Sequence, residues 1–157
     1  MSNKLLAAAG ALALAAAALT QVPALARDGG IDAQATVKAR QSAFMLSAGT
    51  FGAMKGAIDS GAEVKPLTFG ARALARWART LPSMFPAGTG AEAGVPTKAK
   101  PMIWSDRATF EARAADYAAA ADKLAQLAEA GDKAGFAAQW NEVRQTCSGC
   151  HDTFREK

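Results

Sequence analysis

The stretch FAAQWNEVRQTCSGCHDTF, residues 136–154, decides the fold of this chain. Within it, apolar and sulfur-containing residues recur in steps of four and three, which is the spacing of one face of an α-helix. The residues on this face are Phe136, Trp140, Val143, Cys147, Cys150 and Phe154. Asp132 precedes the stretch and is a suitable N-cap. The stretch therefore predicts an amphipathic helix whose apolar face carries both cysteines of the chain.

Three earlier segments show the same helical spacing and are separated by turn residues. The apolar positions of the first are Val37, Phe44, Phe51 and Ile58, followed by Gly61 and Pro66. Those of the second are Leu67, Leu74 and Leu81, with Trp77 beside them and Pro82 after them. Those of the third are Phe110, Tyr117 and Leu124, with Ser105 as the expected N-cap and Gly131 as the expected end. Residues 82–101 contain several glycines and prolines without a period, which predicts a long loop.

We expect an all-α fold, an antiparallel four-helix bundle formed by a single domain. Alanine, the best helix former, supplies much of the 50% hydrophobic fraction, and aromatic residues make up only 7%. Apolar residues at heptad-like spacing, two short connections and one longer connection suit such a bundle.

The first 26 residues have the features of a secretory signal peptide. Lys4 is followed by the apolar run of residues 5–19 and then by PALA, residues 23–26, a small-x-small cleavage site. The alternative is a membrane anchor, but a run of roughly 15 residues is shorter than the ~20 that span a bilayer. We predict cleavage after Ala26, a mature chain of residues 27–157, and no stable membrane insertion after cleavage.

The charge of the chain does not favour binding to nucleic acid. The formal net charge is +4, and removal of the signal peptide with Lys4 lowers it to +3. The remaining lysines and arginines are spread among acidic residues rather than clustered, so no basic surface is predicted.

Residues 147–151, CSGCH, contain all of the cysteine and histidine in the chain. Two thiols one helical turn apart can each add to one vinyl group of a single porphyrin, and the adjacent imidazole can then reach the iron. The motif predicts one covalently attached haem c, with thioether bonds at Cys147 and Cys150. His151 is the predicted axial ligand of the iron.

Three other uses of the cysteine pair fit the sequence less well. A disulfide oxidoreductase places the pair at the start of a helix after a strand, whereas these cysteines come late in a terminal helix. A zinc site needs further Cys or His ligands, and the chain has none. A structural disulfide across such a short loop stabilises a protein very little.

The sixth coordination position of the iron decides the function. A methionine ligand would produce a low-spin electron carrier. The candidates are Met45, Met54, Met84 and Met102. Met45 lies one position after Phe44, about 100° round the helix. If Phe44 faces the iron instead, the iron stays five-coordinate and takes only small neutral ligands.

Five short motifs carry a resemblance to a known family. They are residues 40–44 (RQSAF), Phe51-Gly52-x-Met54, residues 85–89 (FPAGT), Ile103-Trp104 and Cys147-x-x-Cys150-His151-Asp152-x-Phe154-Arg155. Together they resemble the cytochrome c-prime family over essentially the whole of residues 27–157. The last motif is common to c-type cytochromes, and its place at the end of a helical chain makes the match specific.

The resemblance implies roles for residues beyond the CSGCH motif. Phe44 matches the apolar residue that blocks the sixth site, and Arg155 matches a basic residue beside the proximal face. Arg40 and Gln41 match positions near the haem edge, although a solvated helix face explains Arg40 equally well. Low-spin relatives carry a methionine in place of Phe44, so a local slip of the first helix would bring Met45 to the iron.

The resemblance also implies a function. It is that of a periplasmic, high-spin, five-coordinate haem protein that binds nitric oxide and carbon monoxide, with possible one-electron transfer to partner proteins. The alternative is a six-coordinate electron carrier that uses His151 and Met45. An enzyme is not expected, because no second histidine or well-placed acid is available for peroxidase chemistry. Family members are commonly homodimers joined through the first two helices, so a homodimer is expected.

Overall fold

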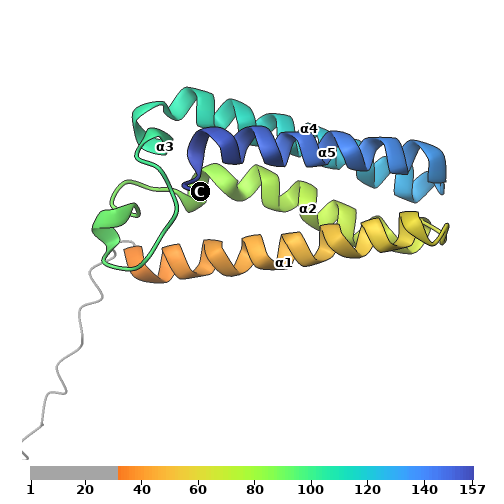
Figure 1. Ribbon diagram of the computed structural model, residues 1–157, viewed down its shortest axis with the longest axis horizontal. Helices are drawn as coiled ribbons and strands as arrows, with labels where there is room; N and C mark the ends of the chain where they lie inside the picture. The colour runs from red at the N-terminus through yellow and green to blue at the C-terminus, as the bar shows by residue number, and fades with distance from the viewer. Residues whose placement is uncertain (1–31) are drawn as a thin grey trace, which may run out of the picture. The chain divides into compact units, whose positions relative to one another are not determined.

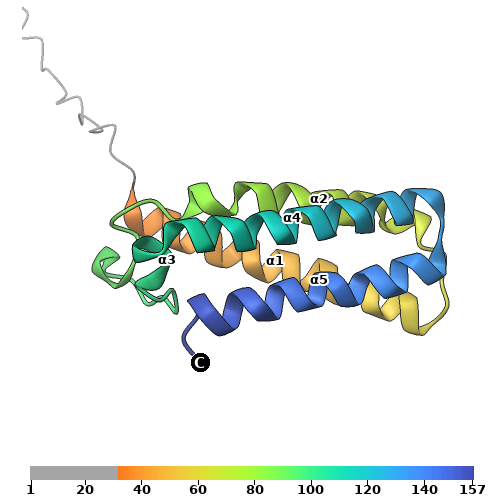
Figure 2. The ribbon, with the colours of Figure 1, turned by 90° about the horizontal axis from the view of Figure 1, so that it is seen from above.

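The computed structural model describes residues 32–157, in which four long helices form an antiparallel bundle (Figure 1, Figure 2). The long helices are α1 (Ala33–Asp59), α2 (Thr68–Thr80), α4 (Arg107–Ala130) and α5 (Lys133–Phe154). The shorter elements are α3 (Met102–Ser105) and 3₁₀ turns at Lys65–Leu67, Leu81–Met84 and Ala91–Ala93. Residues 32–157 contain no β-strand beyond one isolated bridge. The predicted fold is confirmed, whereas the predicted signal peptide, residues 1–26, lies outside the described residues.

Aspartate side chains cap three of the long helices at their N-termini. The carboxylates of Asp32, Asp106 and Asp132 accept hydrogen bonds from the backbone N–H three residues later, at 2.9, 3.3 and 2.9 Å. The cap at Asp132 is as predicted, but the cap predicted at Ser105 is wrong. Ser105 ends α3, and the non-helical backbone of Asp106 (φ −123°, ψ 60°) separates α3 from α4. Gly131, at φ 73°, ends α4 as predicted, in a conformation that favours glycine.

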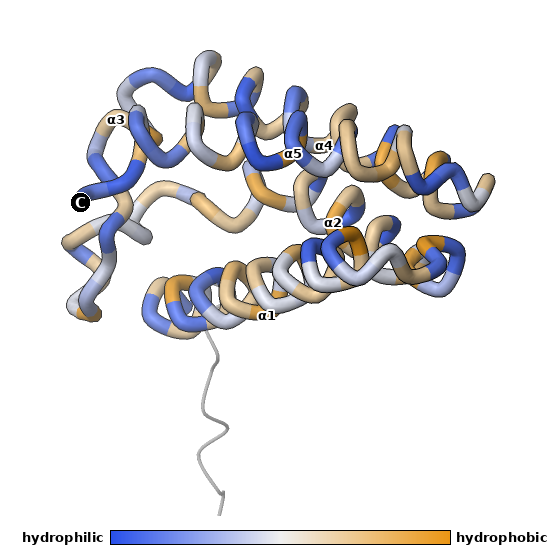
Figure 3. Tube along the Cα trace, turned by 45° about the vertical axis from the view of Figure 1, so that its right-hand side comes forward, coloured by the Kyte–Doolittle hydropathy of each residue, from blue (hydrophilic) through white to orange (hydrophobic). Residues whose placement is uncertain are grey.

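The apolar faces of the helices meet in two clusters, one at each end of the bundle. The first cluster includes Met54, Leu74, Leu124, Phe136, Trp140 and Val143. The second includes Leu81, Phe85, Ile103, Phe110, Ala114 and Phe154. Figure 3 shows hydrophobic and hydrophilic residues alternating along each helix, as expected for amphipathic helices. None of the helices within residues 32–157 combines the length and apolar character that a membrane span requires.

Helix α1 is held by few buried apolar side chains. Of its 27 residues, only Val37, Arg40 and Met54 are buried. Farther along, the Phe51 ring stacks on Trp140 of α5 with centroids 4.4 Å apart, and the Trp140 indole N–H donates to the Phe51 carbonyl at 3.1 Å. Between Arg40 and Phe51, the inner face of α1 therefore contributes no fully buried side chain to the core.

Candidate haem site

A cavity of about 590 Å³ borders this inner face of α1. Its walls come from α1, α3, α4, α5, the loop of residues 82–101 and the 3₁₀ turn at Leu81–Met84. Its main apolar lining residues are Phe44, Ala48, Leu81, Phe85, Ile103, Phe110, Ala114, Tyr117 and Phe154. Its main polar lining residues are Arg40, Gln41, Ser47, Thr97, Lys98, Arg113, Thr146, His151 and Arg155, together with Cys147 and Cys150. The volume and the largely apolar lining are those of a site for a cofactor or small ligand.

The cavity brings together the three residues that the sequence assigns to haem attachment. Cys147 and Cys150 are free and half-buried in the wall. Burial raises the pKa of the Cys147 thiol and raises that of Cys150 to about 11, so both remain thiols near neutral pH. Burial and the neighbouring Arg155 lower the pKa of His151, against a smaller opposing effect of Asp152. A neutral imidazole offers a nitrogen lone pair to iron, so the donor set fits haem c.

The alternatives for the cysteine pair do not fit this geometry. The thiols lie in the C-terminal half of α5, far from the N-terminal end where a redox-active pair gains its reactivity. They do not form a disulfide. Within residues 32–157, no group of three or more Cys, His, Asp or Glu side chains is arranged to hold a metal ion. Porphyrin attachment is the chemistry that the arrangement supports.

Phe44 lies in the cavity wall and is held there by two aromatic neighbours. Its ring meets Trp77 edge to face, with centroids 5.2 Å apart, and Phe85 at 6.4 Å. Met45 also lines the cavity, but it is 76% exposed. The other three candidate methionines, Met54, Met84 and Met102, do not line the cavity. The ring of Phe44, rather than a thioether, occupies the inner side of α1.

Arg40 and Gln41 fasten the loop of residues 82–101 to α1. Arg40 is only 2% exposed, so the solvated helix face considered for it is wrong. Its guanidinium donates to the Thr89 carbonyl at 2.6 Å and the Thr89 hydroxyl at 2.9 Å, and lies 4.1 Å from the Phe85 ring centroid. It also donates to the Met84 carbonyl and the Thr97 hydroxyl, both at 3.3 Å. Gln41 donates to a loop carbonyl at 2.8 Å.

The same loop is fastened to the end of α5. The backbone N–H of Lys100 donates to the Phe154 carbonyl at 3.0 Å, and that of Glu156 donates to the Lys98 carbonyl at 2.8 Å. Arg155, between these two bonds, lines the cavity mouth together with Lys98. Neither Arg155 nor Lys98 forms an ion pair within residues 32–157, so both cations can interact with haem carboxylates.

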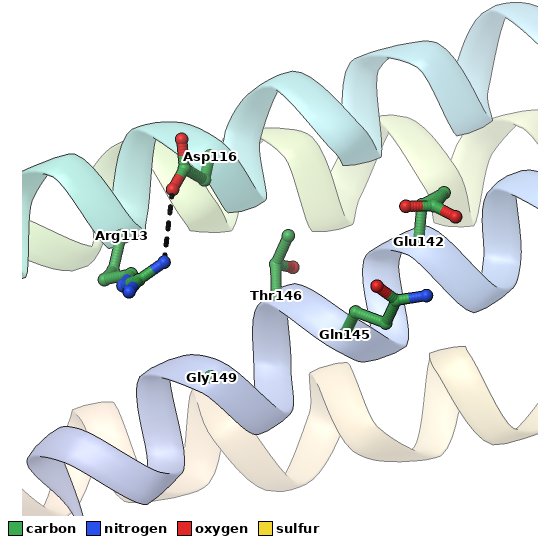
Figure 4. Close-up of a pocket in the computed structure, with 6 residues that line it drawn as sticks. All are labelled: Arg113, Asp116, Glu142, Gln145, Thr146 and Gly149. Carbon is green, nitrogen blue, oxygen red and sulfur yellow. Dashed lines mark ion pairs between the residues drawn. The ribbon is translucent and has the colours of Figure 1, made fainter.

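A smaller groove of about 260 Å³ lies beside the cavity, between α4 and α5 (Figure 4). Arg113 and Thr146 line both spaces. In the groove, Arg113 pairs with Asp116 at 3.8 Å, and Glu142 and Gln145 extend from α5. The groove contains no cysteine or histidine, so the site chemistry belongs to the larger cavity.

The sequence did not reveal the partners that position these side chains. Thr89 is fully buried and accepts hydrogen bonds from Arg40. Its burial could not be predicted, because a threonine in a glycine-rich loop is usually exposed. Trp77 appeared only as a neighbour of a leucine stripe, and its contact with Phe44 depends on how α1 and α2 pack. The FPAGT motif at residues 85–89 was the one signal that this loop matters.

Comparisons with known proteins agree with this site. A family model described as "Cytochrome C'" matches residues 35–155. The cytochrome c' of Rubrivivax gelatinosus is 39% identical over 125 residues, which are 77% of this chain and 94% of that protein. The solved nitric oxide complex of a cytochrome c prime variant from Alcaligenes xylosoxidans has a TM-score of 0.71 at 30% identity, covering 80% of this chain and 97% of that chain.

A carbon monoxide-bound variant of the same Alcaligenes protein matches with the same TM-score of 0.71, 30% identity and the same coverage of 80% and 97%. The family match extends over nearly all of the described residues, and it includes the helices, the loop and the CSGCH motif. The chain therefore belongs to the cytochrome c-prime family and carries covalently bound haem c.

Proposed function

We propose that this chain is an exported haem protein that binds nitric oxide and carbon monoxide at a high-spin, five-coordinate iron, with one-electron transfer as a second use of that iron. One observation carries the proposal: His151 of α5 and Phe44 of α1 line the same cavity, and the chain has no second histidine. The gas complexes of the related Alcaligenes protein support it.

Cys147 and Cys150 hold the haem in this proposal by forming thioethers, and His151 supplies the axial nitrogen. Both cysteines already lie in the cavity wall on the same helix as His151, so attachment needs no rearrangement of α5. When bound, haem c supplies an iron that can take a diatomic ligand and exchange one electron. Lys98 and Arg155 line the cavity without an ion-pair partner within residues 32–157 and offer positive charge to the haem carboxylates.

Phe44 selects the ligand by limiting space and polarity. Its contacts with Trp77 and Phe85 restrict the motion of the ring, so an entering ligand must be small. A phenyl ring donates no hydrogen bond, and a charged or hydrated ligand would lose solvation beside it without compensation. Neutral diatomic gases are therefore favoured over water and anions.

The alternative is a low-spin electron carrier in which Met45 is the sixth ligand of the iron. Met45 favours this function because it alone among the four candidate methionines lines the cavity. The exposure of Met45 argues against this function, because Met45 would have to turn inward and displace Phe44 from its aromatic neighbours.

The proposed location is the periplasm, where a chain exported with a signal peptide would meet electron-transfer partners. A homodimer through α1 and α2 is part of the proposal. Leu46 on α1 and Phe69 on α2 are 74% and 84% exposed, and large apolar side chains in such positions suit a contact with a second copy. Analytical ultracentrifugation of the purified protein would measure the mass of the assembly and so test for the homodimer.

The absorption spectrum of the dithionite-reduced protein, recorded before and after addition of carbon monoxide, tests the function. A broad visible band that sharpens, with a large Soret shift on adding the gas, is expected for an open sixth position. Sharp, split bands that carbon monoxide does not move would contradict the proposal and favour Met45 as the sixth ligand.

A further inference from the structure

Tyr117 is the one tyrosine of the chain, and its side chain lies in the cavity wall. It occupies the α4 stripe between Phe110 and Leu124, which are both buried and apolar. The stripe explains an aromatic ring at this position but not a hydroxyl group. A tyrosine hydroxyl at a partly buried position usually finds a hydrogen-bond partner. The Tyr117 hydroxyl forms no hydrogen bond with any residue of 32–157, so no protein partner within the described residues accounts for it.

The Tyr117 oxygen is accessible rather than enclosed in the core. In the described part of the chain, Trp77 Nε1 is the one buried side-chain nitrogen or oxygen that lacks a partner. The unpaired Tyr117 oxygen is therefore not fully buried, and the side chain that carries it lines the cavity. Burial of the ring and the neighbouring Cys147 sulfur raise the pKa of Tyr117. The phenol thus stays protonated, and remains a donor, at neutral pH.

The other hydroxyl groups of the cavity wall are already engaged. Ser47 donates to the Phe44 carbonyl at 2.9 Å, and Thr146 donates to the Val143 carbonyl at 2.8 Å. The Thr97 hydroxyl accepts from Arg40 and from a backbone N–H in its own loop. Among the hydroxyl groups of the cavity wall, that of Tyr117 alone neither donates nor accepts a hydrogen bond within residues 32–157.

We infer that the Tyr117 hydroxyl donates a hydrogen bond to an acceptor atom of the group bound in the cavity. The inference rests on the proposed function and deepens it. The acceptor belongs either to the diatomic ligand or to a carboxylate of the haem, which offer the same lone-pair chemistry. In the first case nitric oxide and carbon monoxide dissociate about two- to tenfold faster from Tyr117→Phe than from the native protein, the effect of one net hydrogen bond.

The infrared C–O stretch of the phenol in the haem-loaded protein is the direct test, because the chain has one tyrosine and the band belongs to Tyr117 alone. A band of a donating phenol that appears only in the gas complex identifies the ligand as acceptor. A donating band both with and without gas identifies the haem carboxylate. A non-donating phenol in both states overturns the inference.

Gas dissociation rates of two variants complete the test. Tyr117→Phe removes the free hydroxyl, and Thr80→Val removes a hydroxyl outside the cavity that is already bound to a backbone carbonyl, with an equally small change of shape. If the ligand is the acceptor, Tyr117→Phe speeds dissociation and Thr80→Val does not. If both variants speed it equally, a role for Tyr117 toward the ligand is refuted. If the native protein does not bind gas, only the proposed function is refuted. The phenol band of the gas-free protein then still shows whether Tyr117 donates a hydrogen bond to a haem carboxylate.

Discussion

Replacing Arg40 by methionine should release the loop of residues 82–101 from α1. The native guanidinium uses four N–H donors on the loop, two of them on Thr89, which is fully buried. In Arg40→Met the Thr89 and Met84 carbonyls lose a charged donor. The Thr89 and Thr97 hydroxyls keep their bonds to Pro86 and Ala99.

The magnitude follows from these losses. A hydrogen bond to a charged group contributes roughly 1.5–3 kcal/mol, and a desolvated cation–π contact contributes about 2 kcal/mol. Against this, burial lowers the pKa of Arg40 by disfavouring the charged guanidinium, and methionine relieves that cost. The free energy of unfolding should fall by about 2–4 kcal/mol.

Urea unfolding of the haem-loaded protein measures this loss, and amide hydrogen exchange locates it. Exchange should accelerate at the amides of residues 89–99 and remain slow in α4. Arg40→Lys should lose nearly as much, because a single ammonium cannot reach acceptors on both sides of the loop. Arg72→Met, which removes an exposed ion pair to Glu129, should cost about 1 kcal/mol or less. An Arg40→Met protein no less stable than Arg72→Met, with unchanged loop exchange, would refute the reasoning.

Four further changes test other parts of the site. Phe44→Ala should raise the association rate and affinity for carbon monoxide, measured by stopped flow, and an unchanged affinity would show that Phe44 is not the gate. Met45→Leu should leave the high-spin spectrum of the reduced protein unchanged, whereas a loss of low-spin bands would identify Met45 as a ligand. Tyr117 has a raised pKa in the folded chain, so the unfolded chain loses this proton first as the pH rises above about 10. Above this pH, the free energy of unfolding of the native protein should therefore fall more steeply than that of Tyr117→Phe, by up to about 1.4 kcal/mol per pH unit. Urea unfolding measures both slopes. Asp132→Ala removes the N-cap of α5 and should cost about 1 kcal/mol, seen as a lower melting temperature.

The helices of this protein were predictable because each has an apolar face with helical spacing. Phe136, Leu124 and Leu74 are buried as that spacing requires. The start of α4 was missed because Ser105 and Asp106 are adjacent and both are good caps, and the choice depends on how α3 packs. Local sequence does not contain that information.

The prediction of the site had a similar limit. The chemistry of Cys147, Cys150 and His151 is local, since three residues of one helical turn define it, and the sequence therefore indicated the cofactor. The burial of Arg40 is not local, because its partners Thr89 and Thr97 are 49 and 57 positions away. Only the fold brings a loop without periodicity against α1 and makes a charged side chain part of the interior.

The loop therefore sets the spacing of the helices around the cavity. Arg40 ties it to α1, and Arg107 of α4 donates to the Phe85 carbonyl at 2.9 Å and the Pro82 carbonyl at 2.6 Å. The backbone bonds of Lys98 and Lys100 tie it to the end of α5. Because α1 has few buried apolar residues of its own, these polar contacts add to the aromatic contacts of Phe44 with Trp77 and Phe85 in holding α1 beside the cavity. The distance between Phe44 on α1 and the imidazole on α5 thus depends on a loop that contacts both helices, together with the direct contact of Phe51 with Trp140.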